Sequence, residues 1–96
     1  MDERLSVTSG RLNEGEGQVW TGKIVLKAIT INTDKTNDVT ITLYDGNSPK
    51  AKNGWGYRVP GPSDGTGRNF TNLLFENGLY YKLEGSGSYC YIEKMA

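Results

Sequence analysis

Few residues of this 96-residue chain could carry catalytic chemistry. The sequence has no histidine and a single cysteine, Cys90, so it cannot build a Ser-His-Asp triad or a Cys-His dyad. Pairs of carboxylates could still act as general acid and base. The candidates, all in or beside turns, are Asp34, Asp38, Asp45, Asp64 and Glu76. Because Asp is common in turns, where it accepts hydrogen bonds from nearby backbone amides, we predict that the chain is not an enzyme.

Metal and cofactor sites have equally little support in the sequence. Without histidine, a zinc or copper site would depend on Cys90 and carboxylates. Calcium could bind loop carboxylates at Asp34, Asp38 and Asp45, but these residues do not form a complete ligand series. The glycines between residues 61 and 67 lack the spacing of a phosphate-binding loop. We therefore predict neither a metal nor a cofactor, and we assign Cys90 to packing as a small apolar residue.

Aromatic residues are the stronger candidates for binding. Trp55 and Tyr57 lie in a glycine-rich stretch, where their rings could stack on a sugar or fill a pocket of a partner. The alternative is that these two rings cap one end of the hydrophobic core. Trp20 borders an apolar stretch, and we interpret it as a core or rim residue.

Charge and hydropathy restrict the classes of partner. Eleven Lys and Arg residues balance eleven Asp and Glu residues, so no net field attracts nucleic acid or an anionic membrane. No apolar run approaches the roughly 20 residues that span a bilayer. The charged start, Met1 to Arg4, lacks the apolar stretch of a signal peptide, which predicts synthesis in the cytoplasm.

The length of the chain allows one hydrophobic core. Residues 1–17 are polar and dotted with glycine, and we interpret them as an N-terminal arm with one short strand around Leu5 to Thr8. Residues 18–96 then form a single β-sandwich domain. Because one cysteine cannot form an internal disulfide, a homo-oligomeric interface is the remaining source of extra stability.

Apolar residues alternate with polar ones at the two-residue period of β-strands. Ile24 and Leu26 share one phase of this alternation, and Ile29 and Ile31 share the other, which predicts a bulge near residues 27–28.

The clearest strand is VTITL at residues 39–43, which follows a polar loop. We expect residues 29–31 and 39–43 to pair antiparallel across that loop.

A hairpin is predicted at the C-terminal end, where two alternating segments flank the turn GSGS. Placing Leu83 opposite Cys90, and Tyr81 opposite Ile92, keeps the apolar set on one face. The predicted core residues are Val39, Ile41, Leu43, Leu79, Tyr81, Leu83, Cys90 and Ile92.

The outward face of this hairpin is a candidate partner-binding surface. It would carry three tyrosines, whose rings are adhesive while their hydroxyls stay hydrated. The predicted partner-binding residues are therefore Tyr80, Tyr89 and Tyr91, together with Trp55 and Tyr57. The alternative is that the three tyrosines pack across the strands and stabilise the hairpin.

The middle of the chain, residues 45–68, contains all three prolines and favours loops. Trp55, Tyr57 and Val59 alternate and could form a short edge strand, and residues 69–75 should return to the sheet. Together these patterns predict an all-β fold, a small antiparallel β-sandwich of seven to eight short strands. Both a jelly-roll and an immunoglobulin-like strand order fit.

Two parts of the sequence resemble small virion proteins of tailed bacteriophages. They are VWTGKIVLKAITIN with DVTITLYDG, and ENGLYY with GSGSYCYI. The likeness, made largely of strand and turn residues, is to the β-sandwich decoration or cement proteins of phage heads.

This resemblance implies a structural protein of the virion, made in the host cytoplasm, that docks on the capsid lattice and stabilises the head. Its protein partners would be the major capsid subunits, and the family has no catalytic residues to carry over. A different class stays open, a carbohydrate- or receptor-binding β-sandwich module of a tail fibre. In that role Trp55 and Tyr57 would contact a host glycan.

Overall fold

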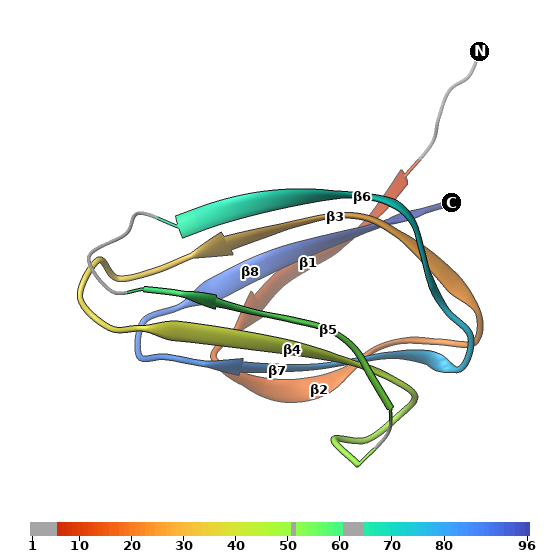
Figure 1. Cartoon of the computed structure of the whole chain (residues 1–96), viewed down its shortest axis with the longest axis horizontal. Helices are drawn as coiled ribbons and strands as arrows, with labels where there is room; N and C mark the ends of the chain where they lie inside the picture. The colour runs from red at the N-terminus through yellow and green to blue at the C-terminus, as the bar shows by residue number, and fades with distance from the viewer. Residues whose placement is uncertain (1–5, 51, 61–64) are drawn as a thin grey trace.

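The computed structural model describes residues 6–50, 52–60 and 65–96, which contain eight β-strands and no helix (Figure 1). The strands are β1 (Ser6–Asn13), β2 (Gly15–Thr21), β3 (Ile24–Asn32), β4 (Val39–Asp45), β5 (Lys52–Val59), β6 (Gly65–Phe75), β7 (Gly78–Glu84) and β8 (Tyr89–Met95). The predicted all-β class is therefore confirmed.

The strands form two antiparallel four-stranded sheets that face each other. Sheet A has the order β1-β8-β3-β6, and sheet B has the order β2-β7-β4-β5. Only the connection from β4 to β5 stays within one sheet, and every other connection crosses to the opposite sheet. This is the strand order of a jelly roll, so the structure selects the jelly roll over the immunoglobulin-like alternative.

The two predicted strand pairings are wrong. The strand pair expected at residues 29–31 and 39–43 is split, because β3 belongs to sheet A and β4 to sheet B. The C-terminal hairpin is split in the same way, since β7 pairs with β2 and β4 while β8 pairs with β1 and β3. Strands that face each other across a sandwich need the same inward alternation as strands paired side by side, so the pattern could not separate the two arrangements.

The GSGS segment forms the crossing from sheet B to sheet A. Gly85 and Gly87 both have positive φ, at 136° and 75°, which glycine adopts without strain. Ser88 is buried, and both its backbone N–H and its hydroxyl donate to the Gly85 carbonyl oxygen, at 3.1 and 2.5 Å. These bonds satisfy the polar groups of a tight turn at the end of the core.

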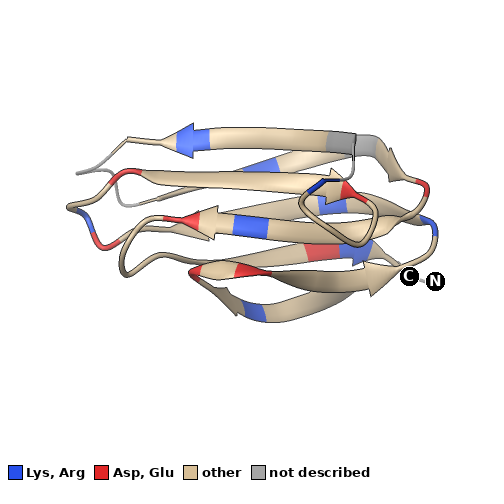
Figure 2. Ribbon diagram, turned by 90° about the horizontal axis from the view of Figure 1, so that it is seen from below, with Lys and Arg blue, Asp and Glu red and all other residues tan. Residues whose placement is uncertain are grey.

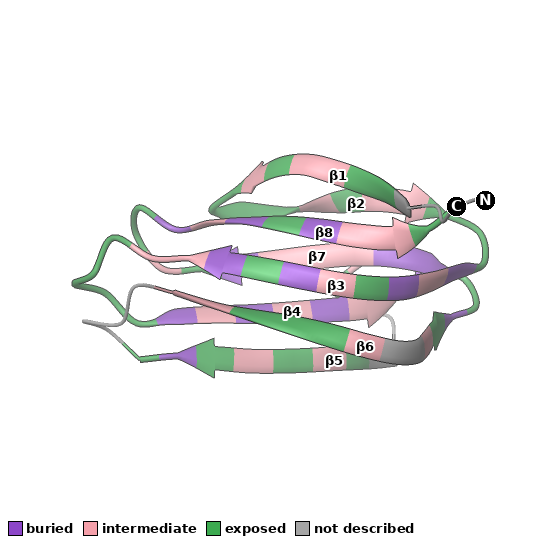
Figure 3. Ribbon diagram, turned by 90° about the horizontal axis from the view of Figure 1, so that it is seen from above, coloured by how far each residue is buried: buried purple, intermediate pink, exposed green. Residues whose placement is uncertain are grey.

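The core fills the space between the sheets. Its buried apolar residues are Ile24, Leu26, Ile29, Ile31, Val39, Ile41, Leu43, Val59, Phe75, Leu79, Leu83, Cys90 and Ile92. Seven of the eight predicted core residues are in this set, and the eighth, Tyr81, is partly buried against it. Buried and exposed segments alternate along β3 (Figure 3), and its pairing shifts register between Leu26 and Ala28, which confirms the predicted bulge.

The N-terminal and middle segments contribute more strand than expected. Residues 6–13 form β1, which pairs with β8, and β2 begins at Gly15 and pairs with β7, so the sandwich extends into the predicted arm. Residues 1–5 lie outside the described residues. The edge strand predicted around Trp55 is β5, and β6 begins at Gly65 rather than at residue 69.

Two polar side chains hydrogen-bond to the backbone of the loops at one end of sheet B. The Gln18 amide nitrogen lies 2.6, 3.1 and 3.1 Å from the carbonyl oxygens of Trp20, Gly46 and Leu79. The Asp45 carboxylate accepts hydrogen bonds from the backbone N–H groups of residues 76 and 77, at 3.2 and 2.7 Å. These contacts join segments that are distant in sequence.

We expect Ile41→Ala to lower the free energy of unfolding by about 2–5 kcal/mol, because Ile41 is fully buried between the sheets. The control is Thr30→Ala on the exposed phase of β3, with an expected loss below about 1 kcal/mol. Urea unfolding followed by circular dichroism measures both values. A loss under about 0.5 kcal/mol for Ile41→Ala would contradict the assigned core.

Candidate binding surfaces

The five predicted binding residues lie in three places. Tyr89 and Tyr91 lie on the outer face of sheet A, in β8, and Tyr80 lies on the outer face of sheet B, in β7. The single face expected for these tyrosines therefore does not exist, because β7 and β8 belong to opposite sheets. Trp55 and Tyr57 lie in β5, opposite Leu43 and Ile41, and so face inward.

The outer face of sheet A carries an ordered aromatic pair. The rings of Tyr89 and Tyr91 meet edge to face, with centroids 6.0 Å apart. The Arg11 guanidinium of β1 lies 3.9 Å from the centroid of the Tyr89 ring, within the range of a cation–π interaction. Across the sheet, Tyr91 is paired with Arg11 on one side and Thr30 on the other.

Sheet A also carries the exposed large apolar side chains. Among the described residues these are Val7, Leu74, Tyr91 and Met95, with exposed fractions of 40, 43, 39 and 50%. All four lie in β1, β6 or β8, which are strands of sheet A. Leu74 is paired with Val25 on the outer face of β3. Sequence reasoning missed Leu74 and Met95, although each stands in the outward phase of a strand, where a polar residue is usual.

The outer face of sheet B has a different chemistry. Tyr80 meets Tyr44 edge to face at 6.3 Å, and its hydroxyl donates a 2.7 Å hydrogen bond to the Glu16 carboxylate. This hydrogen bond raises the pKa of Tyr80 above its usual value. The next row of the sheet places Lys82 between Glu16 and Thr42. Charges of both signs are interspersed over the molecule (Figure 2), without a large field of one sign.

The rings of β5 and β6 pack together where the two sheets meet at their edges. Trp55 and Tyr57 lie nearly parallel, 14° apart with centroids separated by 6.0 Å, and Phe70 of β6 meets Trp55 edge to face at 5.2 Å. The Arg68 guanidinium lies 4.4 Å from the centroid of Tyr57. Trp55, Tyr57 and Phe70 are partly buried against the core, so this cluster closes the sandwich between the edge strands.

The carboxylates considered as acid–base candidates serve loops in the structure. Asp34 accepts hydrogen bonds at 2.8 Å from the backbone N–H groups of Thr36 and Asn37. Asp38, just before β4, pairs with Arg58, while Asp45 stands at the opposite end of the same strand. Asp64 lies outside the described residues. Within the described ranges, no three His, Cys, Asp or Glu side chains gather where they could hold a metal ion.

Cys90 is fully buried on the inward face of β8. Burial raises the pKa of its thiol to about 12, so the thiol stays neutral and unreactive in the folded protein. Desolvation also raises the pKa of the neighbouring Tyr81, whose hydroxyl donates to the Asn13 carbonyl oxygen at 2.9 Å. Cys90 and Tyr81 therefore contribute to packing and to the hydrogen bonds of the fold.

Comparison with known proteins gives no relative from which a function could be inferred. No protein-family model, curated protein or solved structure matches the chain. In the part of the chain that the structure describes, no helix has the length and apolar character that crossing a membrane requires. The surfaces described above are thus the basis for assigning a role.

Asp34 provides a prediction about acid pH. Hydrogen bonds from the backbone of Asn37 and Thr36 lower its pKa below the ordinary value of 3.8. The ionised Asp34 carboxylate should therefore stabilise the folded protein fully above pH 3.8. This contribution to the free energy of unfolding should disappear as the pH falls through the lower pKa that Asp34 has in the folded protein. Urea unfolding across this range should show the difference in stability between the parent chain and Asp34→Ala shrinking. An NMR titration that placed the Asp34 pKa at or above 3.8 would contradict the assignment.

Cys90 provides a second prediction. A soluble thiol reagent should react with Cys90 only in molecules that have unfolded. Ile41→Ala raises the equilibrium constant for unfolding, so it should increase the labelling rate in proportion. The unfolded thiol ionises near its ordinary pKa of 9.0, well before the folded one, so stability should fall as pH rises above that value. Cys90→Ala should make this alkaline slope shallower, and Tyr80 and Tyr81, whose pKa values are also raised in the folded protein, should account for part of what is left. Rapid labelling of a protein that keeps its native circular dichroism would show that the thiol is accessible.

Proposed function

We propose that the chain is a non-catalytic protein that docks on a capsid lattice, as a decoration or cement protein of a tailed-bacteriophage head. Its partners are then the major capsid subunits, and its location is the virion. The supporting observation is that three of the four exposed large apolar side chains of the described residues, Leu74, Tyr91 and Met95, lie on the outer face of sheet A. The resemblance of the strand and turn sequences to such proteins points the same way.

Sheet A is the docking face in this proposal. Its outer surface combines Tyr91, Leu74 and Met95 with the Arg11–Tyr89 pair, and Tyr, Met and Arg are enriched in protein interfaces. The backbone of a central strand is already hydrogen-bonded on both sides, so contacts are made by side chains across a broad, stiff surface. Such a surface suits a protein that bridges neighbouring shell subunits.

Sheet B is the face left in solvent. Its outer rows are dominated by charged and hydroxyl side chains such as Glu16, Lys82 and Thr42. The Tyr80 hydroxyl is engaged by Glu16, and none of the exposed large apolar residues of the described chain lies there. Burying this face against a partner would require desolvating several charges, which is unfavourable without matched partners.

Glycan binding is the second candidate function, since jelly rolls form lectin domains as well as viral capsid domains. The nearly parallel rings of Trp55 and Tyr57 favour it, because parallel rings offer a stacking surface. Arg68 covers one face of the Tyr57 ring, however, and both rings are partly buried. Lattice docking is therefore the first proposal.

Two matched substitutions test the docking face. Tyr91→Ser combined with Leu74→Ser should weaken binding to capsids assembled without the protein by more than tenfold, about 1.4 kcal/mol. Tyr80→Ser makes the same chemical change on sheet B and should leave capsid binding unchanged. Cosedimentation with purified capsids gives the affinities, and circular dichroism confirms that each variant is folded.

Unchanged capsid binding in the sheet A variant, with the fold intact, would overturn the docking face. No binding to capsids, together with glycan-array binding that Trp55→Ala abolishes, would replace the proposal with the second function.

A further inference from the structure

Two sides of the sandwich are formed by edge strands, each of which pairs with one neighbour among the described strands. β1 and β2 lie on one side of the molecule, and β5 and β6 lie on the other (Figure 3). An edge strand presents a row of backbone N–H and C=O groups with which a further strand can pair. The four edge strands differ in how long this row stays regular.

Regular pairing is longest in β5 and β6. Register shifts interrupt the pairing of β1 and of β2, so no regular piece of either strand is longer than four residues. In β5, residues 55–59 pair with β4 without a shift, and in β6, residues 65–69 pair with β3 in the same way. Because bulges protect a strand edge from further pairing, a partner strand meets fewer obstacles at β5 and β6.

Side-chain chemistry favours β5 over β6 as the edge for a partner. The inward residues of the regular piece of β5 are Trp55, Tyr57 and Val59, and the two rings are only partly buried against the core. The regular piece of β6 has glycine at two of its five positions, which leaves little side chain to bury against a partner. A strand added at β5 would therefore cover aromatic surface that the single molecule leaves in water.

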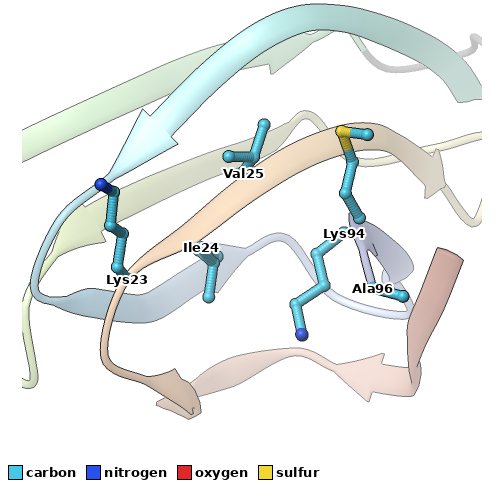
Figure 4. Close-up of a pocket in the computed structure, with 6 residues that line it drawn as sticks. Lys23, Ile24, Val25, Lys94 and Ala96 are labelled. Carbon is cyan, nitrogen blue, oxygen red and sulfur yellow. The ribbon is translucent and has the colours of Figure 1, made fainter.

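A pocket of about 290 Å³ lies at one end of sheet A, where β3 begins and β8 ends (Figure 4). Its lining residues fall within 23–25 and 94–96, so none of them comes from β5. β5 therefore offers a partner a strand edge rather than this cavity, and the contact it can make is backbone pairing.

The regular piece of β5 is self-complementary when two copies pair antiparallel about Tyr57. Tyr57 then lies opposite Tyr57 of the second copy, Gly56 lies opposite Arg58, and Trp55 lies opposite Val59. Aromatic rings paired with each other or with β-branched residues stabilise a sheet. Glycine leaves room for the arginine of the second copy, and within residues 55–59 no pair brings like charges together.

The two ends of this piece define the register. Gly54 is the extra residue at the shift between Leu43 and Tyr44, and Pro60 has no N–H group to donate. In the pairing centred on Tyr57 these two positions face each other, so the five regular residues of each copy pair throughout. A pairing shifted along the strand would place Gly54 or Pro60 opposite a regular residue of the other copy.

We propose that two copies of the chain pair β5 with β5, antiparallel about a twofold axis at Tyr57, so that sheet B of each copy joins one continuous sheet of eight strands. A twofold axis closes the assembly, because each copy uses the same edge. The dimer does not rest on the capsid role, since its residues lie at the edge of sheet B and outside the docking face of sheet A. It covers Trp55 and Tyr57, so this dimer and a glycan site at these rings exclude each other.

Charges of opposite sign introduced at one position test the pairing. In the dimer, Gly56 faces Arg58 of the second copy, so Gly56→Lys adds a like charge and Gly56→Glu an opposite one. The dimer dissociation constant should be at least tenfold higher for the first variant than for the second. A side chain fits there, because an added Cβ atom would lie 3.5 Å from the Ile41 carbonyl oxygen, an ordinary contact distance. Sedimentation equilibrium gives both constants, and circular dichroism checks each fold.

Thr30→Lys and Thr30→Glu are the matched control, because Thr30 is exposed on the outer face of sheet A. These two variants should have equal dimer dissociation constants. In about 1 M salt the difference between the two Gly56 variants should shrink, since exposed charges are screened.

Disulfide cross-linking tests the register. Gly56→Cys mixed with Arg58→Cys should give a linked heterodimer under mild oxidation, because directly paired residues have Cβ atoms about 4.5–5.5 Å apart. Gly56→Cys alone should link far more slowly, since the two copies of this position are diagonal neighbours about 7–8 Å apart. The parent chain is the blank, because Cys90 is buried and its thiol stays neutral.

A parent chain that stays monomeric up to roughly millimolar concentration would overturn the proposal. Equal dissociation constants for the two Gly56 variants would do the same, as would rapid linking of Gly56→Cys alone, which moves the axis. Gly67→Cys lies in β6, and a dimer linked there but not through β5 would place the interface in sheet A. Capsid binding is measured separately: a monomer that binds capsids contradicts this inference alone, and a dimer that does not bind them contradicts only the proposed function.

Discussion

In the described residues, the backbone hydrogen bonds between strands lie within sheet A or within sheet B, so inward side chains hold the two sheets together. The fit is close: a Cβ atom added at Gly54 would overlap the ring of Phe75. With one buried cysteine and no disulfide, this apolar layer supplies most of the stability that separates the folded from the unfolded chain. The hydrogen bonds of Gln18 and Asp45 lie at one end of this apolar layer, where they hold the loops in place.

Because the core uses one face of every strand, the protein has two broad outer faces with independent chemistry. Sheet A exposes Tyr91, Leu74 and Met95, whereas sheet B exposes charges and a tyrosine pair tied to Glu16. Among the described residues, this asymmetry distinguishes the two sides of the molecule. The proposed role uses it, with sheet A towards a partner and sheet B towards water.

Alternation along the sequence predicted seven of the thirteen buried apolar residues of the described chain, and it predicted the bulge of β3 that lets Ile29 follow Leu26 into the core. Phe75 and Val59 were not among the predicted core residues. Alternation could not predict partners, because a residue such as Leu83 points inward whether Cys90 lies beside it or across the sandwich. The predicted tyrosine face failed for this reason alone. Leu74 was missed because an apolar residue in the outward phase looks like ordinary strand composition. Only the fold shows that it shares a sheet with Tyr91.

The last two strands of the chain occupy interior positions, β7 between β2 and β4 and β8 between β1 and β3. During synthesis, the strands made first therefore cannot complete either sheet. The edges of β1 and β3 that pair with β8 stay unpaired until β8 has been synthesised. Folding is consequently a late, non-local event, and such topologies form slowly. Nascent chains held at this stage expose strand edges that can pair with one another.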